Sequence, residues 1–244
     1  MQQPGRSKRF SLEFLLVIFC ICFVSPQIKA QYGVRAGISI ANFYYPNQGP
    51  DPDISYDIDL RPYLGYDIAW VQLGKQKPIV GPYLSVYRLY PLAKRLILSA
   101  ELAFTQKGVN FSQSTYEKIK YKVRITYLEI PVMLSYEFIQ REKWILGIGG
   151  GLYGALSLAA RKKVETHNTG MQTSQIENAS RFISGLSVAL NNKYKLQSHF
   201  IAVNLRVFWD LTDALEIPED QIDIYHHIQD VRNAGFFLTL GYEF

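Results

Sequence analysis

The sequence predicts an all-β fold, a transmembrane antiparallel β-barrel of eight strands. Apolar and non-apolar residues alternate with period two along most of the chain, as expected for strands with two unlike faces. The non-apolar face consists mainly of Gly, Ala and Ser, and such small residues suit the crowded interior of a narrow barrel. Short and long spacers alternate between the runs, which is typical of the turns and loops of transmembrane barrels.

The start of the chain is expected to be an export signal that does not belong to the barrel. Residues 6–9 are rich in basic side chains, residues 14–24 are an unbroken apolar run, and Ala30 is a small residue suited to cleavage. This order is typical of a secretory signal peptide. The apolar run is shorter than the about 20 residues that a transmembrane helix needs. We therefore expect cleavage after residue 30 and a single outer-membrane domain over residues 31–244.

Cleavage would change the composition of the chain in two ways. Cys20 and Cys22 both leave with the signal, which excludes a disulfide framework, a cysteine metal site and a cysteine nucleophile. The net charge falls from +5 to +2, because 22 basic and 20 acidic residues remain of the original 26 and 21. The basic character of the whole chain is thus partly a targeting feature, and we expect no nucleic-acid partner.

Each expected strand is a run with the alternating pattern: residues 32–42, 80–90, 96–108, 127–136, 144–159, 182–190, 200–211 and 236–244. The spacers fall into a short polar set, at 91–95, 139–143 and 191–195, and a long set, near 44–79, 108–121, 161–181 and 211–234. In outer-membrane barrels the short turns face the periplasm and the long loops face outside. Both ends of the mature chain are therefore expected in the periplasm.

The competing architecture is a soluble barrel whose apolar face points inward. Its outer face would meet water and would be rich in Lys, Glu and Thr, not in Gly, Ala and Ser. The apolar face also carries aromatic residues near strand ends, as the aromatic girdle of a membrane barrel requires, at Tyr136, Trp144 and Trp209. The apolar face is therefore expected to contact lipid.

The inward face would then carry a network of polar and charged side chains: Arg35, Glu101, Glu129, Asn204, Arg206 and Glu243. Isolated charges in a narrow lumen are costly, so these groups should pair. Arg35 is expected to pair with Glu243, and Arg206 with Glu129 or Glu101. Such pairs predict a plugged core without an open pore.

The stretch 121–136 changes phase in its middle. Up to Tyr127 the odd-numbered residues are apolar, and from Leu128 onward the even-numbered residues are apolar. A β-bulge near 127–128 would keep both halves facing lipid. Pro131 has no N–H to donate, so it should lie where the ladder of hydrogen bonds is already broken.

No catalytic or metal site is expected from the residue spacing. His226 and His227 lie beside several aspartates, but their spacing fits no closed four-ligand site, and a polar loop is the favoured interpretation. The serines and histidines of the loops show no arrangement suited to a catalytic triad: Ser112, Ser114, His167 and His226. We therefore expect a protein that is not an enzyme and holds no cofactor.

Charged clusters in the loops suggest partners. The basic ones are residues 161–163 and the set Lys118, Lys120, Lys122 and Arg124. They could contact lipopolysaccharide phosphates or simply be solvated. The first and last loops are acidic, at Asp51, Asp53, Asp57 and Asp59 and at Asp213, Glu216, Glu219, Asp220 and Asp223. Opposite charges on different loops suit a surface that faces a partner or is bridged by divalent ions.

The last strand resembles the assembly signal that the barrel-insertion machinery of the outer membrane recognises. It ends in a terminal phenylalanine and carries one apolar row: Phe236, Leu238, Leu240, Tyr242 and Phe244. Longer stretches resemble the PorT family of outer-membrane barrels, at residues 32–43, 90–111, 127–136 and 237–244. Residues 60–79 depart from the family's usual first loop, and an extra hairpin or rim-lying segment is expected there.

The resemblance to the PorT family implies an integral outer-membrane protein without known catalysis. It also implies an accessory or assembly role in type IX secretion, which carries gingipain-type proteases and adhesins to the cell surface. Partners would be other secretion components, besides outer-membrane lipid and lipopolysaccharide. The alternatives are a structural or adhesive barrel that acts through its loops, and a small-solute channel.

Overall fold

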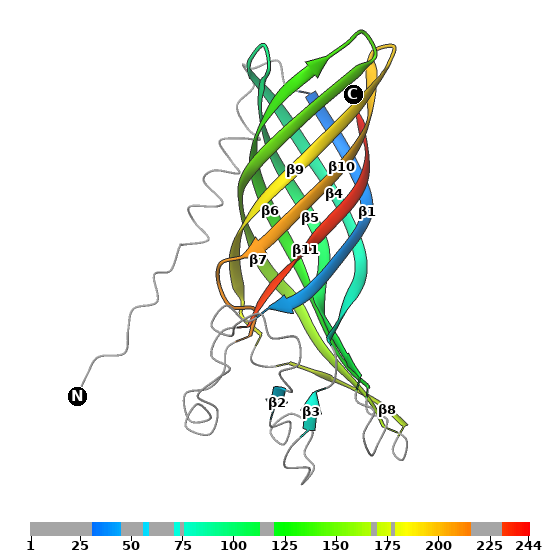
Figure 1. The fold of residues 1–244 in the computed structure, drawn as a ribbon, viewed down its shortest axis with the longest axis vertical. Coiled ribbons are helices and arrows are strands. Elements are labelled where there is room, and N and C mark those ends of the chain that lie inside the picture. Colours follow the sequence, from blue (N-terminus) through cyan, green and yellow to red (C-terminus); the bar gives the residue numbers. More distant parts are fainter. Residues whose placement is uncertain are drawn as a thin grey trace, which may run out of the picture.

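The computed structural model describes residues 31–44, 56–58, 71–73, 76–112, 120–166, 170–176, 179–215 and 231–244. Within this part of the chain, eight long antiparallel strands close into a barrel, so the expected fold class is confirmed (Figure 1). The barrel strands are β1 (Gln31–Tyr44), β4 (Gln76–Ala93), β5 (Leu96–Ser112), β6 (Lys120–Gln140), β7 (Trp144–Thr166), β9 (Phe182–Leu196), β10 (His199–Asp210) and β11 (Arg232–Glu243). The described residues contain no helix that is both long and apolar enough to span a membrane.

Three short strands lie outside the barrel wall. β2 (Tyr56–Ile58) and β3 (Val71–Leu73) pair with each other as a hairpin, partly within the segment where an additional hairpin was expected. β8 (Gly170–Gln175) pairs with the far end of β7. These additions all lie at the end of the barrel that carries the long connections (Figure 1).

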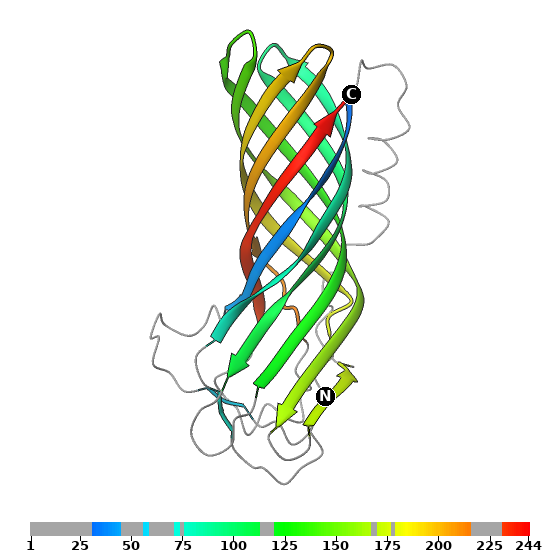
Figure 2. The ribbon, with the colours of Figure 1, turned by 90° about the vertical axis from the view of Figure 1, so that its right-hand side faces the viewer.

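The ring closes where the two ends of the chain meet. β1 pairs with β11, and Tyr32 and Phe244 exchange two backbone hydrogen bonds of 3.3 and 2.9 Å. On the far side of the ring, β6 pairs with β7 over most of the length of both strands. The strands are steeply tilted and coil around the axis (Figure 2), as barrel closure requires.

The barrel has two unlike ends, which we name by their connections. At the turn end, tight connections at residues 94–95, 141–143 and 197–198 join the strands, and both ends of the barrel domain lie there. At the loop end, the strands are longer than expected. β5 extends to Ser112 instead of residue 108, and β7 extends to Thr166 instead of residue 159. The turn expected at 191–195 is wrong, since these residues belong to β9. Polar residues mark an inward-facing row there, not a connection.

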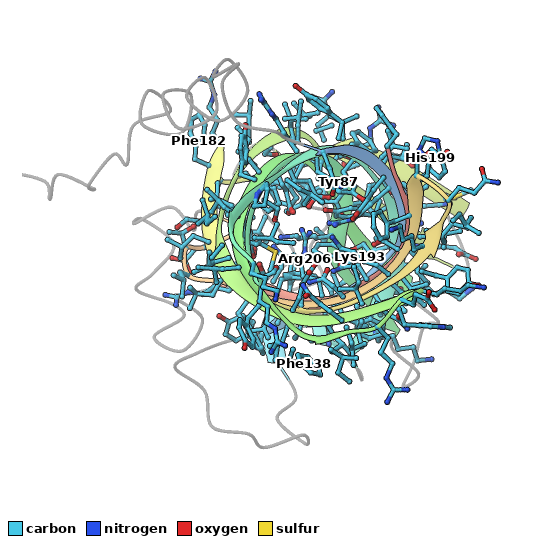
Figure 3. The ribbon with its side chains drawn as sticks, turned by 90° about the horizontal axis from the view of Figure 1, so that it is seen from above. Tyr87, Phe138, Phe182, Lys193, His199 and Arg206 are labelled. Carbon is cyan, nitrogen blue, oxygen red and sulfur yellow. The ribbon has the colours of Figure 1, made fainter. Side chains whose placement is uncertain are left out.

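The expected assignment of the two faces holds along the central part of each strand. Seen down the axis, Tyr87, Lys193 and Arg206 point into the ring of strands, whereas Phe138, Phe182 and His199 lie outside it (Figure 3). The row on β11 that includes Phe236 and Phe244 is exposed on the outer face. Apolar side chains cover the outer surface and small or polar ones fill the interior, as in a barrel that faces lipid.

The phase change in β6 has a different origin from the expected one. Val123, Ile125 and Tyr127 are buried on the inward face, in the same row as Glu129. The expectation that both halves of this stretch face lipid is therefore wrong. On the loop-end side of Leu128, at residues 120–127, the strand leaves the apolar band. There its outer face is polar and its inner face is apolar, as in a soluble barrel.

A β-bulge does occur at this level, but in the neighbouring strand. Thr126 pairs with Ala159 and Tyr127 with Ser157, which leaves Leu158 of β7 as the extra residue. Pro131 lies at a separate break: the β5–β6 pairing passes from Ala100–Val132 to Ala103–Glu129 without the two pairs between them. The missing N–H of Pro131 explains this interruption, which is distinct from the break that the bulge near 127–128 was expected to supply.

Candidate functional site

The interior of the barrel holds three groups of charged side chains, one above another along the axis. The group nearest the turn end is centred on Lys193 of β9. Its Nζ lies 3.1 Å from Glu243 Oε2 and 3.6 Å from Glu137 Oε1, and Tyr87 donates a hydrogen bond of 3.1 Å to Glu243. One cation is thus shared by two buried carboxylates at the turn end.

The middle group has the opposite charge pattern. Glu101 accepts from Arg206 at 2.5 Å and from Arg35 at 3.2 Å, both through its Oε2 atom. Tyr83 donates to the other carboxylate oxygen of Glu101 at 2.8 Å. The guanidinium of Arg35 also lies 3.8 Å from the centre of the Tyr87 ring, which links this group to the first. One carboxylate on β5 therefore binds two arginines, one from β1 and one from β10.

The group nearest the loop end is centred on Lys107, whose side chain is fully buried. Its Nζ lies 2.7 Å from Glu129 Oε1 and 3.2 Å from Asp210 Oδ1. The Phe208 and Tyr153 rings lie 4.2 and 4.5 Å from this cation. Tyr153 also donates a hydrogen bond to Asp210. A desolvated ammonium is thus neutralised by two carboxylates and favoured further by aromatic faces.

Each tyrosine that donates to a lumen carboxylate has a glycine directly opposite on the neighbouring strand. Tyr87 faces Gly33 and Tyr83 faces Gly37 between β4 and β1, and Tyr153 faces Gly185 between β7 and β9. A Cβ at Gly33 would lie 2.4 Å from the Tyr87 ring, and one at Gly185 would lie 2.3 Å from the Tyr153 ring. Because glycine has no side chain, the Tyr87 and Tyr153 rings can lie over the neighbouring strand and reach their carboxylates.

An apolar layer closes the lumen beyond the Lys107 group. It contains buried side chains from five barrel strands and from residues just outside β10 and β11: Phe43, Val109, Val123, Ile125, Tyr127, Ala155, Ala160, Ile183, Ala214 and Val231. Ile176, Ser180 and residues 211–214 next to this layer are held by backbone hydrogen bonds, including Ser180 N–H to Ala214 O at 3.0 Å. We call this cluster the apolar cap.

The lumen cavity described near the turn end is small. A cavity near the turn end, lined by Arg35, Met133, Glu137 and Lys193 among others, has a volume of about 20 Å³. Such a cavity has room for about one water molecule. Fixed charges of alternating sign and the apolar cap therefore occupy the path that a solute would need.

The structure places all six side chains expected in the lumen network on the inward face, and it changes some of the expected pairs. Arg206 pairs with Glu101, which was one of its two candidate partners. The Arg35–Glu243 pair is wrong, because Arg35 binds Glu101 and Glu243 binds Lys193. Asn204 donates to Asn191 at 2.5 Å. Glu129 pairs with Lys107.

Sequence reasoning missed all the charged partners in these three groups other than the expected ones: Lys107, Asp210, Glu137 and Lys193. Lys107 and Asp210 lie beside expected loop boundaries, and Lys193 lies in an expected turn. Their register gave a usable signal. Lys107 follows Glu101, Ala103 and Thr105 at period two, and Asp210 follows Arg206 and Phe208 in the same way.

The residues expected in the aromatic girdle lie on the outer surface. Tyr136 and Trp144 are at the turn end and Trp209 is at the loop end. Trp144 packs edge-on against Tyr194 with 5.1 Å between ring centres, and Tyr242 stacks on His199 at 5.4 Å. Aromatic side chains therefore lie near both edges of the apolar band.

Among the described residues, no cluster of His, Asp or Glu has the geometry of a metal site. Several of the side chains discussed for the loops lie outside the described residues: Asp51, Asp53, Asp59, Ser114, Lys118, His167, Glu216, Glu219, Asp220, Asp223, His226 and His227. Asp213 is described, and its Oδ1 lies 3.0 Å from Arg232 Nε.

A closed barrel with a lipid-facing apolar surface, aromatic edges and a polar interior defines an integral outer-membrane β-barrel protein. The chain belongs to the family described as outer membrane protein β-barrel domain, whose model matches residues 25–216. The resemblance to the PorT family stays a prediction. The protein is located in the outer membrane.

Comparison with solved structures gives further outer-membrane proteins. The attachment invasion locus protein of Yersinia pestis is 10% identical, with 89% of this chain and 100% of that chain covered and a TM-score of 0.38. Neisserial surface protein A is 12% identical over 88% of this chain and 97% of that one, with a TM-score of 0.41. OprG from Pseudomonas aeruginosa is 13% identical over 89% and 97%, with a TM-score of 0.43. A search of curated protein sequences finds no match.

Proposed function

We propose that this protein is a non-conducting, non-enzymatic barrel that anchors a working surface at the loop end in the outer membrane. The filled lumen is the observation that carries the proposal. Three charged groups and the apolar cap occupy the axis, and the described cavity there has a volume of only about 20 Å³. A barrel that passes no solute through its lumen contributes through the parts that it holds at the membrane surface.

The particular role that we propose is that of an accessory or assembly component of type IX secretion. The sequence resemblance to the PorT family supports it. A narrow eight-stranded barrel has room only for side chains, so it cannot itself carry a folded protease or adhesin. The barrel would instead assemble or stabilise a separate translocon, through its loops and turns.

The test is a deletion of the gene in its own bacterium, followed by measurement of cargo proteases and adhesins on the cell surface. The proposal expects cargo to be retained in the periplasm and expects a plasmid copy of the wild-type gene to restore delivery. Normal delivery in the deletion strain would refute the secretion role.

The same strain tests the second candidate, a structural or adhesive barrel that acts through its loops. The long β6 and β7 strands and β8 project at the loop end of the barrel and give this candidate a specific surface (Figure 2). It expects lost attachment of the cells to host or abiotic surfaces with secretion unchanged. The channel alternative is not favoured, because the lumen is filled.

A further inference from the structure

Four cations form two adjacent rungs on the outer face of the β6–β7 hairpin. The register places Arg124 directly opposite Arg161 and Lys122 directly opposite Lys163. Arg124, Arg161 and Lys163 are exposed, and Lys122 is half-buried. We call these four residues the basic ladder. Side chains at opposite positions of an antiparallel pair lie about 5 Å apart, and like charges there repel.

The bulge in β7 creates this arrangement. Before Leu158, odd-numbered residues of β7 such as Tyr153 and Ala155 point inward. The extra residue at Leu158 reverses the alternation, so that Ala160 and Lys162 are buried and Arg161 and Lys163 point outward. A bulge that re-aims two cations onto a face already occupied by two others is unfavourable unless something compensates their charge.

The described neighbours of the basic ladder on the outer face supply no compensating carboxylate. Asn110 of β5 lies opposite Lys122, and Thr173 and Gln175 of β8 lie opposite Lys163 and Arg161. Glu165 is one rung further out and pairs with Lys120 at 3.3 Å. Partial burial and the charges of Arg124 and Lys163 lower the pKa of Lys122.

The basic ladder lies at the height of lipid headgroups. On β6 and β7, Leu128 and Leu158 are the last large apolar residues of the outer face before it becomes polar toward the loop end. Arg124 lies four residues from Leu128 toward the loop end, which is about 13 Å along a strand. With a strand tilt of about 40°, this corresponds to a height of about 10 Å above the apolar band. The cations therefore overhang the surface on which acyl chains would lie.

We propose that the basic ladder binds the phosphate groups of a phosphorylated glycolipid in the outer leaflet. Two guanidinium groups and two ammonium groups match a pair of phosphates, because arginine forms bidentate hydrogen bonds to phosphate and lysine adds a point charge. The apolar surface at Leu128 and Leu158 would contact the acyl chains of the same molecule. Bound lipid would supply the negative charge that the protein lacks at this place.

The test measures the affinity of the refolded full mature chain, in detergent micelles, for diphosphorylated lipid A and for lipid A without phosphates. The test variant is Lys122→Gln/Arg124→Gln/Arg161→Gln/Lys163→Gln. The matched control removes the same charge from exposed cations at the turn end, as Lys94→Gln/Arg95→Gln/Arg141→Gln/Lys143→Gln. The mobility of unheated and heated samples on a gel shows whether each variant has folded.

We expect at least a tenfold loss of affinity for diphosphorylated lipid A in the test variant and less than a twofold change in the control. Lipid A without phosphates should bind the wild type as weakly as the test variant does. Equal binding by wild type and test variant, or equal binding of the two lipids, would overturn the proposal. Complete displacement of the lipid by millimolar inorganic phosphate would also overturn it, because the site would then recognise the free ion. If the test variant fails to fold, Arg124→Gln/Arg161→Gln is used, with an expected loss of at least threefold.

Discussion

At the scale of single residues, Lys107 is a cation that is removed from solvent and depends on two carboxylates for its neutralisation. Its side chain is fully buried between Glu129 and Asp210 and is surrounded by aromatic rings. A buried ion pair adds little net stability compared with an apolar core, but removal of one partner leaves an uncompensated charge. Here the removal of one cation would leave two carboxylates.

We predict that Lys107→Met destabilises the folded barrel by about 3–5 kcal/mol, the range for breaking a buried ion pair. Denaturant unfolding of the refolded protein in lipid vesicles measures the effect. The control is Lys120→Met, which removes an exposed ion pair with Glu165 and should change the stability by less than about 1 kcal/mol. The triple variant Lys107→Met/Glu129→Gln/Asp210→Asn should recover part of the loss. Equal stability of Lys107→Met and the wild type would contradict the assignment.

The residue scale also shows how far the sequence could identify the lumen. Glu101, Glu129 and Arg206 lie in the middle of clear alternating runs, so their inward orientation follows from period two alone. Their partners do not follow, because pairing across the lumen depends on the stagger of the strands, which local patterns do not give. Lys193 was assigned to a turn since a lumen row and a polar turn have the same composition.

At the scale of elements, the fit between tyrosines and glycines sets how closely neighbouring strands approach the lumen contents. We predict that Gly185→Ala destabilises the barrel by about 1–3 kcal/mol, the usual cost of overpacking. A Cβ at this position would lie 2.3 Å from the Tyr153 ring and 2.4 Å from the Trp209 carbonyl oxygen. Thermal unfolding, followed by the loss of the folded gel band, measures the effect.

Gly150→Ala is the matched control for this prediction. Gly150 lies on the outer face of β7, and the nearest atom to an added Cβ is the Ser187 carbonyl oxygen at 3.8 Å. The change should therefore alter the stability by less than about 0.5 kcal/mol. Equal effects at Gly185 and Gly150 would show that backbone entropy, and not the space beside Tyr153, determines the result.

The last strand carries a separate prediction about assembly. Phe244→Ala should lower the amount of barrel in the outer membrane several-fold if the insertion machinery reads the terminal side chain. The substitution keeps the backbone hydrogen bonds between Phe244 and Tyr32. Quantitative blotting of outer-membrane fractions measures the effect, with Phe138→Ala on the outer face of β6 as the control. Normal amounts of the Phe244→Ala protein would refute a role for this side chain.

The β6 strand explains why one element was misread from sequence. Its alternation is unbroken through the buried row Val123, Ile125, Tyr127 and Glu129. What changes along the strand is the medium at its outer face, which is lipid on the turn-end side of Leu128 and water on the loop-end side. A period-two pattern shows that a strand has two faces, but it does not show which face meets which medium. The apparent phase slip therefore marks the edge of the apolar band.

At the scale of the whole molecule, the barrel joins two kinds of interior. The membrane-embedded part is polar inside and apolar outside. The part on the loop-end side of Leu128 is apolar inside and polar outside. This change of pattern places a dry layer above the charged groups at the outer mouth. The closed fold and its strand count could be predicted from sequence, whereas the apolar cap could not, because it is assembled from five different strands and from residues outside them.

The central claim is that the lumen is sealed, and ion conductance tests it most directly. The purified mature chain is reconstituted into a planar lipid bilayer, and the current is recorded under an applied voltage. We predict insertion without steady conductance steps, because the three charged groups and the apolar cap occupy the axis. Steady, reproducible steps from the wild-type protein would contradict it.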